Sequence, residues 1–130
     1  MDKRHGHGVY KFADGSRYEG QFEEDRMSGR GAFSSANREQ YSGEYLKDRM
    51  HGEGVRIYAS GNRYEGTFVQ DKKHGQGTFT WVDGGSYVGD WENDMMHGKG
   101  LRRWPNGDQY DGMWAADEYN GLGAFVWADG

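Results

Sequence analysis

The chain has 130 residues, enough for one domain, and its lack of cysteine excludes a disulfide framework and a thiolate zinc site. Leu, Ile, Val and Phe number only 16, but 20 aromatic residues and 23 glycines argue against disorder and favour a thin sheet of rings packed on bare backbone. The net charge of −5 argues against a nucleic-acid binder, and without a long apolar run we expect a soluble, cytoplasmic chain.

A tyrosine followed by X-Gly recurs every 23 residues, at Tyr18, Tyr41, Tyr64, Tyr87 and Tyr110. With this tyrosine counted as position 1, position 3 is glycine, position 5 is aromatic, position 8 is aspartate, and positions 12 and 14 are glycine in every unit. The period divides the chain into a half repeat over 1–17 and repeats over 18–40, 41–63, 64–86, 87–109 and 110–130.

Each unit alternates with period two, which is typical of strands, and a turn dipeptide such as Asp14-Gly15 or Asp83-Gly84 stands near position 20. This pattern predicts a strand over about positions 1–6, a loop over positions 7–11 and a second strand over about positions 12–19. In chain order the predicted strands cover 6–13, 18–23, 29–36, 41–46, 52–59, 64–69, 75–82, 87–92, 98–105, 110–115 and 121–128. No window has the apolar spacing of a helix.

A hairpin of this size cannot bury its own face, so the units must stack into one antiparallel, all-β sheet. The glycines at positions 3, 12 and 14 are expected to leave hollows for rings of neighbouring strands. The aspartate at position 8 is expected to accept hydrogen bonds within its own loop, and the histidine at position 11 to tie that loop to a neighbouring unit.

The heptapeptide D-K-K-H-G-Q-G at 71–77 has close relatives at 2–8, 48–54 and 94–100, and its residue types are compatible with a metal site, a phosphate loop or a structural loop of the repeat. Its histidines occupy the same place in different units, roughly 10 Å or more apart, which is too far for one zinc ion. Its Gly-X-Gly lacks the further residues of a phosphate loop. Because the same residues are copied along a ladder, we predict no enzyme, no metal site and no cofactor.

The recurring Tyr-X-Gly-X-aromatic, His-Gly-X-Gly and Asp-Gly at 23-residue spacing resembles the MORN (membrane occupation and recognition nexus) repeat. The unit Y-E-G-T-F-V-Q-D-K-K-H-G-Q-G-T-F-T-W-V-D-G at 64–84 is a close match. The resemblance covers the full chain and implies an elongated, single-layer twisted antiparallel sheet with an aromatic-rich groove. It is compatible with a protein-binding scaffold, a cytoskeletal or organelle tether, or an accessory domain beside a catalytic one.

The unit that starts at Tyr18 departs from this pattern. Ser28 replaces the histidine, Ser35 replaces the aromatic residue of position 18, and Asn37-Arg38 replaces the Asp-Gly turn. Both ends of the chain resemble interrupted repeats, which predicts that it is an excerpt of a longer array.

Positions 16 and 18 supply the candidate partner-binding groove, because a single sheet leaves one face partly uncovered. Some of these rings must belong to the core. Arg56 and Arg102 stand at position 16, where other units carry a ring, and we expect them to line the groove and select an amphipathic segment with acidic residues, unless they point to solvent. The candidate rings are Tyr10, Phe12, Tyr58, Phe79, Trp81, Trp104, Phe125 and Trp127.

Three classes of function remain open. The first is a scaffold that binds a protein partner at the cytoskeleton or at the cytoplasmic face of a membrane. The second is a module that binds anionic phospholipid, including phosphoinositide, through a basic N-terminal end. The third is a rod that self-associates through its unpaired sheet edges. The basic residues of the second class are Lys3, Arg4, Lys11 and Arg17.

Loop position 10 carries Met27, Met50 and Met96. These side chains either form a second contact strip or pack onto the sheet.

Overall fold

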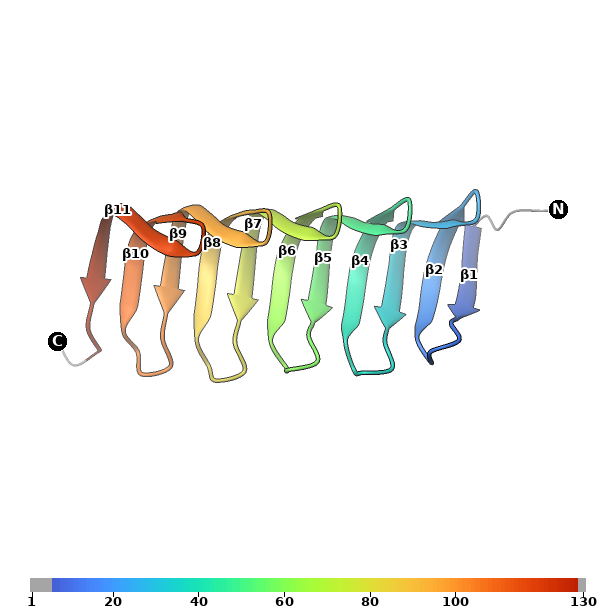
Figure 1. The fold of residues 1–130 in the computed structure, drawn as a ribbon, viewed down its shortest axis with the longest axis horizontal. Coiled ribbons are helices and arrows are strands. Elements are labelled where there is room, and N and C mark those ends of the chain that lie inside the picture. Colours follow the sequence, from blue (N-terminus) through green and yellow to red (C-terminus); the bar gives the residue numbers. More distant parts are fainter. Residues whose placement is uncertain (1–5, 129–130) are drawn as a thin grey trace.

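The computed structural model describes residues 6–128, in which eleven antiparallel strands lie side by side in chain order as one open sheet (Figure 1). This confirms the predicted all-β sheet of stacked hairpins. The described residues contain no helix long and apolar enough to cross a membrane. The strands are β1 (Gly6–Lys11), β2 (Arg17–Glu23), β3 (Arg26–Ser34), β4 (Gln40–Leu46), β5 (Arg49–Ile57), β6 (Arg63–Val69), β7 (Lys72–Thr80), β8 (Ser86–Glu92), β9 (Met95–Arg103), β10 (Gln109–Ala115) and β11 (Glu118–Val126).

Two-residue turns join β2 to β3, β4 to β5, β6 to β7, β8 to β9 and β10 to β11. In the first of them Glu24 and Asp25 have φ angles of 48° and 70°, and each later turn repeats this pair of positive angles. Two positive φ angles in a row are typical of a hairpin turn that follows the natural twist of the strands. The predicted loop over positions 7–11 is therefore wrong, because the second strand already begins at position 9.

The other connections are five residues long and contain the predicted turn dipeptides. Between β1 and β2, the Gly15 amide donates to the Phe12 carbonyl at 3.1 Å, which closes a turn around Asp14. The repeat that starts at Tyr18, which we call the irregular repeat, keeps this turn although Arg38 replaces the glycine. Arg38 adopts a φ of 78°, and its amide donates to the Ser35 carbonyl at 3.2 Å.

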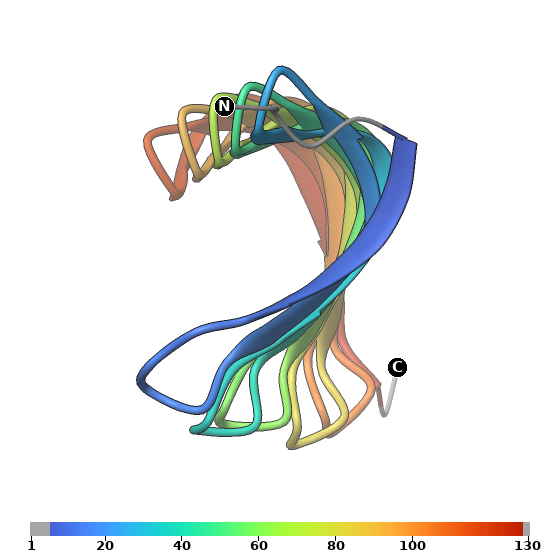
Figure 2. The same cartoon turned by 90° about the vertical axis from the view of Figure 1, so that its right-hand side faces the viewer.

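A β-bulge in each hairpin that is closed by a two-residue turn bends the sheet. In the β2–β3 pair, Gly20 lies opposite Gly31 and Phe22 lies opposite Met27, so three residues of β3 face Gln21 alone. Bulges of this kind increase the local twist and bend the strand. Figure 2 shows the result, a sheet curved into a trough whose two sets of connections turn toward the same side.

The glycines at positions 3 and 14 make room for the tyrosine of their own hairpin. A Cβ atom on Gly31 would lie 2.2 Å from the Tyr18 hydroxyl, and one on Gly20 would lie 2.7 Å from it. That hydroxyl donates to the Gln21 carbonyl in the bulge at 2.8 Å. Gly29 at position 12 differs, since it faces the Gln21 side chain and has a φ of 76°. Ring packing on glycine is thus confirmed for positions 3 and 14 and wrong for position 12.

The aspartate at position 8 connects neighbouring repeats. Asp71 accepts a hydrogen bond from the Met50 amide at 2.7 Å, and its own amide donates to the Met50 carbonyl at 2.9 Å. Asp48, Asp94 and Asp117 repeat this pair of bonds with the preceding repeat. The predicted hydrogen bond within the loop is wrong, because the partner lies one repeat away.

The tie expected of histidine is therefore made by aspartate. The His97 imidazole faces Glu92 of its own repeat, with 3.2 Å between Nε2 and Oε2.

Asp71→Ala should lower the free energy of unfolding by about 2 kcal/mol, since it removes a charged acceptor and places alanine at a φ of 70°. Asp71→Asn is the matched control, because asparagine keeps the side-chain oxygen and tolerates this backbone conformation. Urea unfolding measures both variants. Equal losses for alanine and asparagine would contradict the role of this oxygen in joining the repeats.

Candidate functional site

A continuous row of rings from positions 1 and 5 covers one face of the sheet. Tyr64 makes edge-to-face contacts with the ring of its own repeat, Phe68 at 5.0 Å, and with that of the next repeat, Trp91 at 5.5 Å. Contacts of this geometry stabilise a core beyond the area they bury. The same zigzag runs from Tyr18 to Trp114, and all of its rings are buried.

Burial keeps the tyrosines of this row neutral. The Tyr64 side chain is fully buried, and its hydroxyl donates to the Thr67 carbonyl at 2.9 Å. Burial, with a smaller effect from Tyr58, raises the pKa of Tyr64 far above its ordinary value. Burial also raises the pKa of its counterparts, so the row forms an uncharged floor rather than a set of acid–base groups. These are Tyr18, Tyr41, Tyr45 and Tyr87.

Contact between Lys73 and Tyr58 identifies this ring-bearing face as the concave one. Lys73 lies near the start of β7, beside a two-residue turn, whereas Tyr58 follows the opposite end of β5. Their backbone positions are about 20 Å apart along the strand direction. Even so, Lys73 Nζ lies 3.4 Å from the Tyr58 hydroxyl. Two side chains from opposite ends of the strands can meet only on the side toward which the sheet curves, so both lie on the concave face. Figure 2 shows the concave face of the sheet. We call this face, together with the side chains of positions 10, 16 and 18 that line it, the aromatic groove.

All eight predicted groove rings lie on this face, at different depths. Phe79 is only 8% exposed and belongs to the core. Four others pack against the core and are half-buried, namely Phe12, Tyr58, Trp81 and Trp104. The exposed rings are Tyr10, which contacts Phe12 at 4.7 Å, Phe125, which contacts Tyr110 at 4.8 Å, and Trp127.

The two most exposed rings, Phe125 and Trp127, stack on the half-buried Trp104 at one end of the groove. Trp104 lies 6.1 Å from Phe125 with 22° between the planes, and Phe125 lies 5.3 Å from Trp127 with 15° between them. Phe125 is 41% exposed and Trp127 is 56% exposed. Together with Pro105 and Asp108, these rings line a hollow of about 590 Å³.

Both predicted arginines lie over rings of the groove. The Arg56 guanidinium is 4.6 Å from the centre of the Tyr58 ring and pairs with Glu39 at 2.8 Å, which lowers the pKa of Glu39. The Arg102 guanidinium lies 3.9 Å from the centre of a Trp81 ring. Their placement in the groove matches the expectation. Selection of acidic residues in a partner stays a prediction, and such a residue would compete with Glu39 at Arg56.

The residues of the predicted lipid site are only partly described. Lys3 and Arg4 lie outside the described residues. Lys11 and Arg17 are exposed and lie opposite one another in the β1–β2 pair. Arg17 also forms an ion pair with Glu19 at 2.9 Å, which reduces the positive charge it offers to a membrane.

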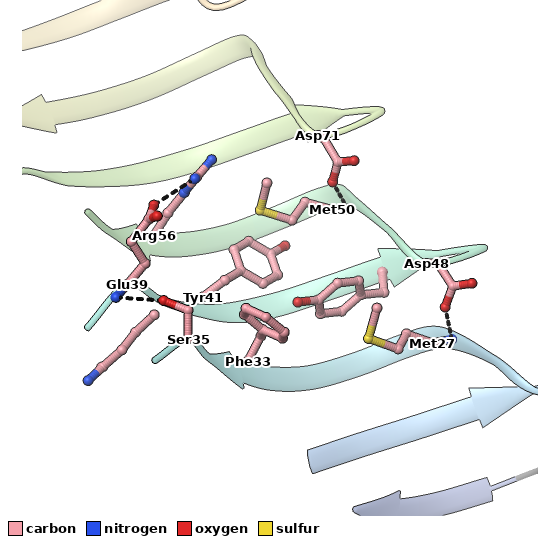
Figure 3. Close-up of a pocket in the computed structure, with 11 residues that line it drawn as sticks. Met27, Phe33, Ser35, Glu39, Tyr41, Asp48, Met50, Arg56 and Asp71 are labelled. Carbon is pink, nitrogen blue, oxygen red and sulfur yellow. Dashed lines mark hydrogen bonds and ion pairs between the residues drawn. The ribbon is translucent and has the colours of Figure 1, made fainter. Parts of the chain in front are cut away.

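A hollow of about 210 Å³ opens in the groove at the irregular repeat (Figure 3). Ser35 stands there in place of the ring at position 18, and its hydroxyl accepts a hydrogen bond from the Glu39 amide at 3.1 Å. The small serine side chain leaves the space open. Besides Ser35 and Glu39, the residues that line this hollow are Met27, Phe33, Gln40, Tyr41, Tyr45, Asp48, Met50, Arg56 and Asp71.

Two features of the groove escaped the sequence analysis. Glu39 neutralises Arg56, and this pairing across 17 residues had no local signal. Lys73 reaches into the groove with a side chain only 13% exposed, and its ammonium lies 5.1 Å from the centre of a Trp91 ring. A signal for Lys73 existed, because it is the one charged residue at position 10 among the five full repeats, where the others hold Met27, Met50, Met96 and Tyr119.

Metal ligation has no candidate among residues 6–128, where no three His, Cys, Asp or Glu side chains are arranged to hold an ion. The chain matches no curated protein. It does match the MORN repeat in six segments, which cover residues 1–17, 18–39, 41–63, 64–86, 87–109 and 110–130. The repeat pattern, the single curved sheet and this match agree, and the chain belongs to the MORN repeat family.

Proposed function

We propose that this array is a non-catalytic scaffold whose aromatic groove binds an amphipathic segment of a protein partner. The observation that carries the proposal is the stack in which the half-buried Trp104 is followed by the exposed rings of Phe125 and Trp127. Exposed apolar clusters of this kind usually mark interaction surfaces. Aromatic side chains also lose little conformational entropy on binding, which makes them effective anchors for a partner.

The charge distribution favours a protein partner over an anionic lipid surface. The chain carries a net charge of −5, and Arg17 at the basic end is already paired with Glu19. An anionic membrane repels a protein of this charge unless a concentrated basic patch compensates. Asp108 also lines the hollow beside the ring stack, where it would oppose a lipid phosphate.

Peptides selected from a random library on the purified chain should be amphipathic, and they should bind Trp104→Ala/Trp127→Ala about thirty-fold more weakly than the wild type. This factor corresponds to the roughly 2 kcal/mol that a ring-centred hot spot contributes. Fluorescence anisotropy measures the affinities, and circular dichroism verifies that the variant folds. Val88→Ala is the matched control, since Val88 is 51% exposed and follows the groove-facing Tyr87 in β8, so that it lies on the opposite face.

Selected peptides that bind the wild type and the double tryptophan variant equally would contradict the proposal. Flotation with phosphoinositide-containing liposomes but not with neutral ones, combined with failure to enrich any peptide, would favour the lipid-binding class instead. A molecular mass that rises with protein concentration, with no peptide enriched, would favour self-association through the sheet edges.

A further inference from the structure

The groove contains two copies of one hollow, three repeats apart. Met27, Tyr45 and Asp48 line the hollow at the irregular repeat. A second hollow of about 510 Å³ is lined by Met96, Trp114 and Asp117, with Arg102, Trp104 and Glu118. Each of the three named residues of the second hollow follows its counterpart in the first by three 23-residue repeats. The same arrangement of methionine, buried ring and aspartate therefore forms both hollows.

Lys73 fills the corresponding place between them. At this place Lys73 takes the position of the methionine, Trp91 that of the buried ring and Asp94 that of the aspartate. The Lys73 ammonium lies 3.6 Å from an Asp94 carboxylate oxygen and 5.4 Å from the centre of the Phe79 ring. Ammonium groups are held in this way by the combined attraction of a carboxylate and of aromatic faces. The chain itself thus shows what this place in the groove accepts, an alkyl stem that ends in a cation.

Both open hollows have the charge to accept such a group. The first is lined by the acidic Glu39, Asp48 and Asp71 and by one base, Arg56, which Glu39 already pairs. The second is lined by two acidic residues and one base. Within residues 6–128, no ion-pair partner lies within 4.0 Å of Asp48 or Asp117. Methionine supplies an apolar wall in each hollow but no cation.

From this repetition we infer that the two hollows are a pair of anchor sites for one basic, amphipathic segment of a partner protein. Each takes an apolar side chain with a lysine or arginine next to it, and the cation lies against Asp48 in one hollow and Asp117 in the other. Three repeats correspond to six strand spacings, about 29 Å. The two anchors of the partner then stand about 19 residues apart in a helix or about 9 in an extended chain. This inference rests on the proposed function and specifies the partner's chemistry.

Two small probes of similar size and opposite charge test the inference. Phenethylamine joins an aromatic ring to an ammonium group, and 3-phenylpropionate joins the same ring to a carboxylate. Labelling the methionine methyl groups with ¹³C gives reporters in the first hollow, at Met27 and Met50, and in the second, at Met96. Met95 and Met113 are exposed and serve as internal controls.

We expect phenethylamine to shift the groove methyls in both hollows and to bind several-fold more tightly than 3-phenylpropionate, while Met95 and Met113 stay unmoved. Asp48→Asn should weaken phenethylamine binding about two- to five-fold at Met27 and Met50 but not at Met96, and Asp117→Asn should weaken it at Met96 but not at Met27 or Met50. Asparagine keeps the oxygen that accepts the inter-repeat hydrogen bond, so these variants change charge with little effect on folding. Lys73→Met should open the middle place, and phenethylamine should then also shift the methyl introduced there.

Equal or tighter binding of 3-phenylpropionate would overturn the inference and leave the apolar groove of the proposed function intact. Shifts confined to one hollow would overturn the pairing of two anchor sites. If neither probe shifts any groove methyl, the inference fails together with the proposed apolar groove, an outcome that differs from the other two in the same spectra.

Discussion

Gly77→Ala should lower the free energy of unfolding by about 4 kcal/mol, a large loss for the addition of one methyl group. The new Cβ atom would lie 2.2 Å from the Tyr64 hydroxyl oxygen and 2.4 Å from the carbon that carries it. Tyr64 cannot move aside freely, because it is fully buried between the rings of Phe68 and Trp91. Overpacking costs about 1–3 kcal/mol, and the displaced hydroxyl leaves the Thr67 carbonyl without its hydrogen bond, at a similar cost.

Gly8→Ala is the matched control for this substitution. Gly8 occupies position 14 of the half repeat, and the nearest atom to a Cβ there is a Phe22 ring carbon at 3.4 Å, an ordinary contact. We expect a change of less than about 0.5 kcal/mol for it. Urea unfolding followed by tryptophan fluorescence compares the two variants. If Gly77→Ala costs no more than Gly8→Ala, the ring-on-glycine packing that replaces a second layer in this fold is not what stabilises the sheet.

The number and order of the strands were predictable from the 23-residue period, but the size of the two-residue turns was not. Hairpin turns of this kind usually carry Asn-Gly or Asp-Gly, whereas the first turn here is Glu24-Asp25 and the second is Lys47-Asp48. The unfavourable backbone of Asp48 is stabilised by a hydrogen bond from the Met27 amide in the preceding repeat. A contact between repeats leaves no mark on the local sequence, so a longer loop was the natural expectation.

The sequence predicted which positions line the groove. It did not predict how deeply each ring is buried or how the charged residues of the groove are paired. Alternation places Phe79 and Trp81 on one face, but only the packing shows that Phe79 is buried while Trp81 is half-buried. Arg56 was expected to attract acidic residues of a partner. The local sequence does not show that it is already paired with Glu39, which lies 17 residues earlier in the chain. The bulge places three residues of the second strand opposite one residue of the first, so period-two counting fails inside it. Gly29 at position 12 faces the Gln21 side chain, whereas Gly31 at position 14 faces the Tyr18 ring.

Raising the pH from 8 to 11 should lower the free energy of unfolding by about 6 kcal/mol. Burial raises the pKa of five core tyrosines, Tyr18, Tyr41, Tyr45, Tyr64 and Tyr87, above the value of about 10 that tyrosine has in an unfolded chain. Their contribution is fully present below pH 10. Above it, the unfolded chain loses phenol protons that the folded chain keeps, so stability falls until the pH reaches the folded pKa. At pH 11 each of the four tyrosines whose pKa is raised most accounts for about 1.4 kcal/mol, namely Tyr41, Tyr45, Tyr64 and Tyr87, and Tyr18 adds to this loss.

A loss of this size equals the entire stability of many domains, so the sheet should unfold cooperatively between about pH 10 and pH 12. Urea unfolding at a series of pH values measures the loss, and the near-ultraviolet absorbance of ionised tyrosine should rise in the same transition. Tyr45→Phe is the matched variant, because Phe22 and Phe68 fill the equivalent position in other repeats. It should reduce the loss at pH 11 by about 1.4 kcal/mol. Tyrosine absorbance that rises while the chain stays folded would show that the rings ionise in place, and the floor of the groove would then carry charge at high pH.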